Sequence, residues 1–111
     1  MRKTLITGAI LTIAGLCATA SFAGGDKALY QQHCVRCHGA DAKGDTKLGM
    51  KLEAKDYSNP KTWEGLTDAA AAKSVKIGFK DKEGKTIMRP TEGLTDADAK
   101  GIISYMKTLK Q

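Results

Sequence analysis

Two cysteines separated by two residues, with a histidine directly after the second, place the strongest constraint on how this chain folds. They form the segment Cys34-Val35-Arg36-Cys37-His38. Two thiols at this spacing near a helix end can each add to a vinyl group of haem, and the next imidazole then projects toward the iron. The pattern therefore predicts one covalently attached haem c, held by Cys34 and Cys37, with His38 as an iron ligand.

The same cysteine pair has two other interpretations. A zinc site needs four protein ligands, and only His33 could join Cys34, Cys37 and His38. A thiol–disulfide oxidoreductase would place its two thiols next to a βαβ unit, and the sequence predicts no such strand. The oxidoreductase stays open as the less favoured alternative, and a pyridine haemochrome assay separates it from a haem protein.

The first 23 residues have the pattern of a secretory signal peptide. A basic start at residues 1–3 precedes an apolar stretch over residues 4–17, and the small residues Ser21 and Ala23 fit cleavage after Ala23. A membrane anchor is the alternative, but the apolar stretch is shorter than the ~20 residues that span a bilayer. We therefore expect a periplasmic protein without stable membrane insertion, with a signal peptide in residues 1–23 and one domain in residues 24–111.

The predicted mature chain has few residues with which to build a core. Its 88 residues include five aromatic residues and fifteen Val, Ile, Leu or Met residues. A domain of this size is marginally stable on its own core, so a large apolar cofactor would complete it. Without Arg2 and Lys3 the chain keeps 16 basic and 12 acidic residues, a net charge of +4. We do not expect nucleic-acid binding from an exported chain without clustered arginines.

Apolar spacing predicts an all-α fold. No stretch shows the alternation of a half-buried strand, and helical spacing is found over residues 26–34, 68–77 and 96–109. Thr67 and Thr95 are expected to cap the last two helices, and Gly78 to end the second. Between the helices we expect a long loop with at most a short helix over residues 39–59, a turn over 80–85 and irregular chain over 86–93.

Four side chains are candidates for the second axial ligand of the iron: His33, Met50, Met88 and Met106. Met106 lies on the apolar side of the last helix and is expected in the core. His33 is too close to His38 to reach the opposite haem face and is expected on the surface. Met88 lies fifty residues after His38, in a stretch expected to be irregular, so the chain can cross the haem edge. We predict Met88 as the ligand, with Met50 as the alternative.

Three segments resemble the class I c-type cytochromes, in particular the short single-haem bacterial periplasmic members. They are LYQQHCVRCHG from residue 29, IMRP from residue 87 and GLTDADAKGIISYMKTL from residue 93. The resemblance covers essentially all of the mature chain. It implies a cytochrome c fold, in which the N- and C-terminal helices cross over one covalently bound haem. It also implies that Tyr30 packs against Ile102 and Tyr105, and that Met88 belongs to the methionine loop of the family.

The resemblance implies further roles for single residues. A backbone carbonyl near Met50 would accept the imidazole N–H of His38, and Leu52 would pack on the haem. Trp63 would pack on the haem or reach a propionate, and an ordinary core or surface position is the alternative.

A His/Met-ligated haem predicts a one-electron carrier and not an enzyme. A neutral thioether favours Fe(II) and closes the iron to external ligands. We expect a monomer that exchanges electrons with a donor and an acceptor protein, such as a reductase, an oxidase or another cytochrome. Lysines and one arginine near the haem edge are candidates for docking: Lys43, Lys47, Lys85 and Arg89. The alternative is a haem-based gas or redox sensor in which Met88 leaves the iron.

Overall fold

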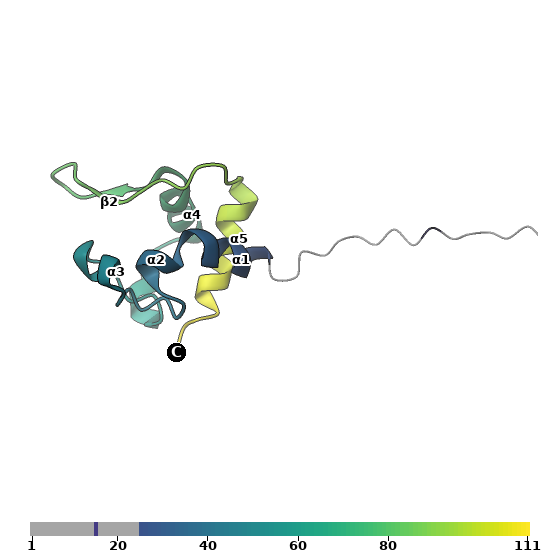
Figure 1. Cartoon of the computed structure of the whole chain (residues 1–111), viewed down its shortest axis with the longest axis horizontal. Coiled ribbons are helices and arrows are strands. Elements are labelled where there is room, and N and C mark those ends of the chain that lie inside the picture. The colour runs from purple at the N-terminus through teal and green to yellow at the C-terminus, as the bar shows by residue number, and fades with distance from the viewer. Residues whose placement is uncertain (1–14, 16–24) are drawn as a thin grey trace, which may run out of the picture.

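Short helices around one long C-terminal helix make up the fold. The computed structural model describes Gly15 and residues 25–111; apart from Gly15, the predicted signal peptide lies outside the described residues. The elements are α1 (Gly25–His33), α2 (Val35–His38), α3 (Lys47–Lys51), the 3₁₀ helix η1 (Pro60–Trp63), α4 (Asp68–Ile77), β1 (Phe79–Lys80), β2 (Thr86–Met88) and α5 (Asp96–Lys107) (Figure 1).

The first helix packs against the last, as predicted. Tyr30 of α1 and Ile102 of α5 are both fully buried. The rings of Tyr30 and Tyr105 lie 5.3 Å apart between centroids. At the same crossing, Gly101 of α5 lies against the carboxylate of Asp26 in α1, where a Cβ on Gly101 would overlap the carboxylate as it is placed.

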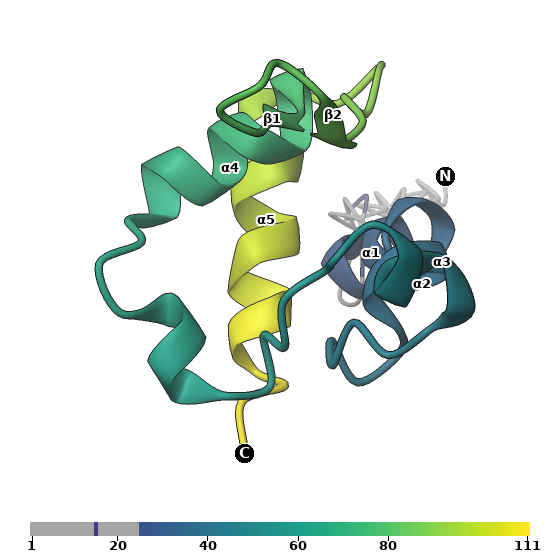
Figure 2. The same cartoon turned by 90° about the vertical axis from the view of Figure 1, so that its left-hand side faces the viewer.

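The fourth helix packs along the other side of α5. In Figure 2, α4 and η1 lie on one side of α5, and α1, α2 and α3 lie on the other. Ion pairs join the helix ends, Lys76 to Asp96 and Lys107 to Asp68. Each pair sets an acidic residue at a helix N-terminus and a lysine at a helix C-terminus, which is the favourable arrangement for the helix dipoles.

The helix ends follow the predicted capping residues. The side chain of Thr67 accepts a hydrogen bond from the N–H of Ala70, and Gly78 ends α4 with φ of +79°. Thr95 forms a capping box with Asp98 at the start of α5. The predicted bounds of α4 are confirmed, and α5 ends two residues earlier than predicted.

The stretch after α4 differs from the prediction. Residues 86–93 were expected to be irregular, but Thr86–Met88 form a strand that pairs with β1 in an antiparallel hairpin. Phe79 is opposite Met88, and Lys80 is opposite Thr86. Strands of two and three residues are too short to show an alternation of apolar and polar residues, so the sequence pattern could not reveal them.

The core of the described residues is built largely from small side chains. Its eleven buried apolar residues include four alanines and only two aromatic rings, those of Tyr30 and Trp63. Met106 is buried, as predicted. None of the helices in residues 25–111 has the length and apolar character needed to cross a bilayer.

Candidate functional site

One helical turn brings Cys34, Cys37 and His38 together. Cys34 lies at the junction of α1 and α2, where its N–H donates to the Tyr30 carbonyl at 2.9 Å. Its own carbonyl accepts the N–H of His38, also at 2.9 Å. Both cysteines are free thiols, Cys34 buried and Cys37 half-buried. The three predicted site residues therefore lie on a turn whose backbone is fixed by its own hydrogen bonds.

Burial controls the protonation of this turn. It raises the pKa of the Cys34 thiol to about 11, and the neighbouring Cys37 adds to the rise. Burial also lowers the pKa of His38 below its ordinary value. At neutral pH the structure therefore holds a protonated Cys34 thiol and a neutral imidazole, and the neutral imidazole is the form that binds a metal.

The loop after α2 packs tightly against it. The Gly44 N–H donates to the His38 carbonyl at 2.8 Å, and the Thr46 hydroxyl donates to the Cys37 carbonyl at 2.8 Å. Gly49 of α3 lies so close that a Cβ there would overlap the Cys37 carbonyl oxygen. The long predicted loop, with α3 as its short helix, therefore supports the site.

The expected acceptor for the His38 imidazole is not found. Nδ1 of His38 is buried and has no hydrogen-bond partner among the described residues. The prediction of an acceptor near Met50 is therefore wrong for the described residues, and the Met50 carbonyl accepts the N–H of Glu53 at 3.3 Å in the turn that ends α3. The side of the imidazole is instead contacted by the ring of Tyr57, at 5.8 Å between centroids and 63° between planes.

Tyr57 is a site residue that sequence reasoning missed. Its N–H donates to the Ala42 carbonyl at 2.8 Å, and its carbonyl accepts Nε1–H of Trp63 at 2.9 Å. Trp63 is therefore a buried core residue whose N–H is already bonded to the backbone, and not directed to a haem propionate. A lone aromatic residue in a loop rich in Gly, Lys and Asp was the available signal for Tyr57.

Met88 is at the end of β2 and is half-buried against the main core cluster, which also contains Cys34. Its backbone is closely packed, because a Cβ on Gly78 would lie 2.5 Å from the Met88 carbonyl oxygen. The alternative ligand Met50 is 66% exposed, and His33 is exposed, as predicted. Leu52 is half-buried at the end of α3, and its predicted haem contact stays a prediction.

The donor set does not suit a metal bound by protein side chains alone. In residues 25–111 and at Gly15, no three His, Cys, Asp or Glu residues come close enough to hold a metal ion. The zinc interpretation therefore lacks its ligands within the described part of the chain.

Comparison with protein families decides between the remaining interpretations. The model of the family described as cytochrome c matches residues 25–110. The chain belongs to the cytochrome c family. This family carries covalently attached haem c and functions in electron transport, and the helix-rich structure is its all-α fold.

Solved structures agree with this assignment. The chain is similar to the KustC0563 c-type cytochrome, with 30% identity, a TM-score of 0.64, and coverage of 78% of this chain and 98% of that one. It is also similar to a tyrosine-to-phenylalanine mutant of Kustc0563, with 26% identity, a TM-score of 0.63, and coverage of 78% and 99%. A comparison with curated proteins gives no match.

The residues of α2 fit haem c. Two free thiols lie within one helical turn, at the spacing that two thioether bonds to one porphyrin require. Burial favours the neutral imidazole of His38, and its Nδ1 makes no hydrogen bond within the described residues. A neutral imidazole is the form that can bind iron.

Proposed function

We propose that this cytochrome is an exported, monomeric, single-haem carrier of single electrons, with His38 and Met88 as axial ligands. The observation that carries the proposal is the position of Met88. It is half-buried on the core cluster that also contains Cys34, and the β1–β2 pairing and the close packing at Gly78 hold its backbone. Thioether attachment through Cys34 and Cys37 and ligation by His38 belong to the same proposal.

Haem c supplies a one-electron couple, and the chain sets its ligands. A neutral thioether favours the reduced iron and raises the potential. The packing of Gly78 against the Met88 carbonyl limits how far the ligand backbone can move. A ligand held in this way keeps its place in both oxidation states, so little rearranges when an electron is transferred.

Electron transfer explains the cysteines better than thiol–disulfide exchange does. A reactive dithiol needs a lowered thiol pKa and an accessible sulfur. Cys34 has the opposite properties, because it is buried and its pKa is raised to about 11. We therefore propose a carrier, and not an enzyme, that exchanges electrons with a reductase, an oxidase or another cytochrome in the periplasm.

The ligand assignment is tested with Met88→Ala and, as a matched control, Met50→Ala. We expect Met88→Ala to lose the methionine–iron charge-transfer band at the red edge of the visible spectrum. Its potential should fall well below that of the parent, within the ~0.8 V that axial ligands span. Met50→Ala should keep both the band and the potential, because Met50 is mostly exposed. The reverse pattern in a redox titration with spectra would assign the ligand to Met50.

Two further measurements test the alternatives. A pyridine haemochrome spectrum of the matured protein is expected, and free thiols in its place would favour an oxidoreductase. The visible spectrum of the reduced protein should stay unchanged under carbon monoxide. Its conversion to the spectrum of a carbonyl haem would favour a gas sensor in which Met88 leaves the iron.

A further inference from the structure

The excess positive charge of the domain is concentrated in one stretch of 17 residues. Residues 73–89 contain six basic and two acidic residues, a net charge of +4. Residues 25–72 contain seven of each kind, and residues 90–111 contain three of each kind. The whole net charge of residues 25–111 therefore lies on the end of α4, on the hairpin and on the residue after Met88.

Most of this charge is exposed and unpaired. Five of the six basic side chains are exposed and form no ion pair within the described residues, and we call these five the basic pole: Lys73, Lys80, Lys82, Lys85 and Arg89. The sixth, Lys76, is paired with Asp96. One of the two acidic residues, Asp81, accepts two backbone N–H groups of the hairpin turn, both at 2.9 Å. The basic pole therefore gives a positive field on one side of the molecule.

The hairpin carries three lysines of the basic pole, Lys80, Lys82 and Lys85, away from the helices. In Figure 1 it extends from the end of α4, and its turn lies far from α5. The turn is closed by hydrogen bonds from the Asp81 N–H to the Lys85 carbonyl at 2.9 Å and from the Gly84 N–H to the Asp81 carbonyl at 3.1 Å. The lysines on it are thus carried by an ordered turn that leads directly into Met88.

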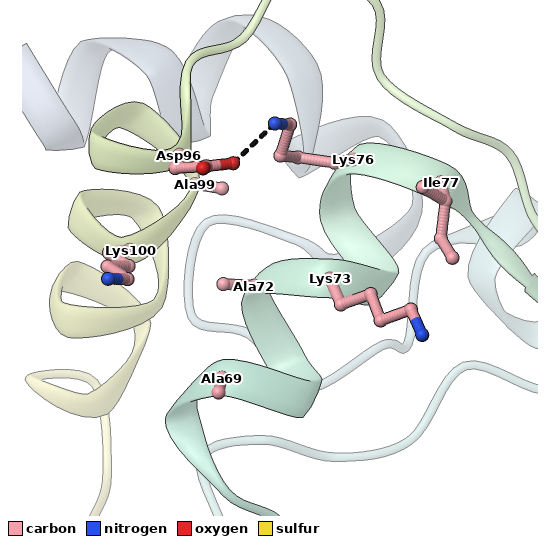
Figure 3. A pocket seen from close by; sticks show the side chains of 8 residues that line it. All are labelled: Ala69, Ala72, Lys73, Lys76, Ile77, Asp96, Ala99 and Lys100. Carbon is pink, nitrogen blue, oxygen red and sulfur yellow. Dashed lines mark hydrogen bonds and ion pairs between the residues drawn. The ribbon is translucent and has the colours of Figure 1, made fainter.

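Two large apolar side chains are exposed within the same stretch. Ile77 is 62% exposed and Phe79 is 55% exposed. Ile77 and Lys73 of α4 line a groove between α4 and α5, together with Lys100 and three alanines (Figure 3). Apolar residues with a charged rim are the usual composition of a protein-binding surface.

The other predicted docking lysines have compensating surroundings. Lys43 and Lys47 belong to residues 25–72, where basic and acidic residues are equal in number. Lys43 also acts on a nearby carboxylate: hydrogen bonds from Ser58 lower the pKa of Asp56, and the Lys43 charge adds to that lowering. These lysines therefore serve as natural controls for the basic pole.

We propose that the basic pole, with Ile77 and Phe79 beside it, is the docking surface for an acidic electron-transfer protein. The proposal rests on the proposed carrier function and on the electron crossing the Met88 side of the molecule. Opposite charge on a partner would raise the rate of encounter. Apolar contact at Ile77 and Phe79 would then hold the complex.

The test is the rate at which a reduced plant-type [2Fe–2S] ferredoxin, used as an acidic redox protein, reduces the ferric holoprotein in a stopped-flow instrument. One electron leaves the cluster and one enters the haem, and no proton moves. We expect Lys82→Glu/Lys85→Glu to slow the reaction at low ionic strength by about tenfold or more. The difference from the parent should vanish near 1 M salt, where the screening length is ~3 Å.

The matched control is Lys43→Glu/Lys47→Glu. Both double variants lower the net charge of the mature chain from +4 to zero, so they differ only in where the charge changes. We expect the control to slow the reaction about threefold or less. Equal slowing by both variants would mean that only net charge matters, and greater slowing by the control would place docking on the other side. Either result overturns the proposal.

The apolar part of the surface has a separate test. Ile77→Ser should slow the reaction in high salt as well, because an apolar contact is not screened. An unchanged rate in high salt would contradict the proposed contact of Ile77 with the partner. If anionic phosphatidylserine vesicles bind the parent but not Lys82→Glu/Lys85→Glu, while ferredoxin reduces both at one rate, the surface binds membranes and the proposal is overturned.

Failure of docking is distinguishable from failure of the carrier function. Spectra and potential are measured first for each variant, and reduction by ascorbate gives the intrinsic competence of its haem. A parent without the methionine band, or one that does not cycle between oxidation states, would contradict the carrier function. Parent-like spectra with unchanged ferredoxin kinetics in Lys82→Glu/Lys85→Glu would contradict only the docking surface.

Discussion

The buried hydroxyl of Tyr30 connects the first helix to the chain just after His38. It donates a hydrogen bond to the Gly39 carbonyl at 2.5 Å, and Tyr30 has no exposed surface. Burial, more than the neighbouring Cys34, raises the pKa of Tyr30 above its ordinary value. The folded protein therefore keeps this hydroxyl protonated at pH values where an unfolded tyrosine ionises.

We expect Tyr30→Phe to lower the free energy of unfolding at pH 7 by about 1–2 kcal/mol, the value of a buried hydrogen bond. The parent should also lose stability as the pH rises above ~10, because unfolded Tyr30 then releases a proton that folded Tyr30 keeps. The stabilisation from this group is complete below that pH. Tyr30→Phe should show a shallower alkaline loss in guanidinium titrations of the holoprotein at several pH values.

Tyr105→Phe is the control for the loss of a hydroxyl from the same ring pair. Its hydroxyl makes no hydrogen bond among the described residues, so we expect a change at pH 7 within ~0.5 kcal/mol. The opposite outcome is that Tyr30→Phe matches Tyr105→Phe in its free energy of unfolding and loses stability above pH ~10 as steeply as the parent. That result would show that the hydrogen bond to Gly39 does not stabilise the protein.

Gly49 lets α3 pack closely against α2, because it has no side chain. A Cβ there would overlap the Cys37 carbonyl oxygen and lie 2.6 Å from the Gly44 carbonyl oxygen. Both are backbone atoms that cannot rotate away. We expect Gly49→Ala to destabilise the holoprotein by about 1–3 kcal/mol, despite the better helix propensity of alanine, as measured by chemical denaturation.

Gly101→Ala is the matched comparison, because it also adds a methyl group to a helical glycine. The atoms in its way belong to the carboxylate of Asp26, which can turn toward solvent. We expect its stability to stay within ~1 kcal/mol of the parent. A larger loss for Gly101→Ala than for Gly49→Ala would show that the helix crossing is the more rigid contact.

At the scale of elements, the helix ends could be predicted from the sequence, because local chemistry determines them. Thr67 and Thr95 begin α4 and α5, and Gly78 ends α4, because capping depends on residues within one turn. The hairpin was not predictable in the same way. Its strands are two and three residues long, and their pairing depends on contacts between Gly78, Met88 and the residues after it.

Substitutions at two glycines of the hairpin region can distinguish the effect of backbone strain from the effect of contact with Met88. Gly78 and Gly84 have φ of +79° and +80°, so alanine is strained at both, by about 1–2 kcal/mol. Only at Gly78 would a Cβ also lie 2.5 Å from the Met88 carbonyl oxygen and 2.9 Å from the nitrogen of Pro90. We expect Gly78→Ala to weaken the methionine–iron band and lower the potential.

The control Gly84→Ala should lose a similar amount of stability from strain and keep the spectrum of the parent, because nothing lies within 4 Å of its Cβ. Spectra and redox titrations of the two variants decide the point. Parent-like spectra in both would mean that the hairpin does not position Met88.

At the scale of the whole molecule, the site divides into a local part and an assembled part. Cys34, Cys37 and His38 could be found from sequence because they occupy one helical turn. The contact of Tyr57 with His38, and the missing acceptor for Nδ1, arise where the loop of residues 39–57 returns to α2. Such returns depend on long-range packing, which no local pattern encodes. The place of Met88 as a ligand stays a prediction.

We expect the core of the described residues to be too small to hold the fold together without haem. It consists of eleven buried apolar residues, four of them alanines, whereas Met50, Ile77 and Phe79 remain largely exposed. A domain of this length rarely gains more than ~3–5 kcal/mol from its core alone. We expect Cys34→Ser/Cys37→Ser, made without attached haem, to lose most of its helical circular dichroism and its cooperative thermal transition. The parent produced without haem-attachment machinery should behave in the same way, which separates the cofactor from the two substitutions. A sharp transition and a dispersed NMR spectrum in either sample would mean that the polypeptide alone specifies the fold.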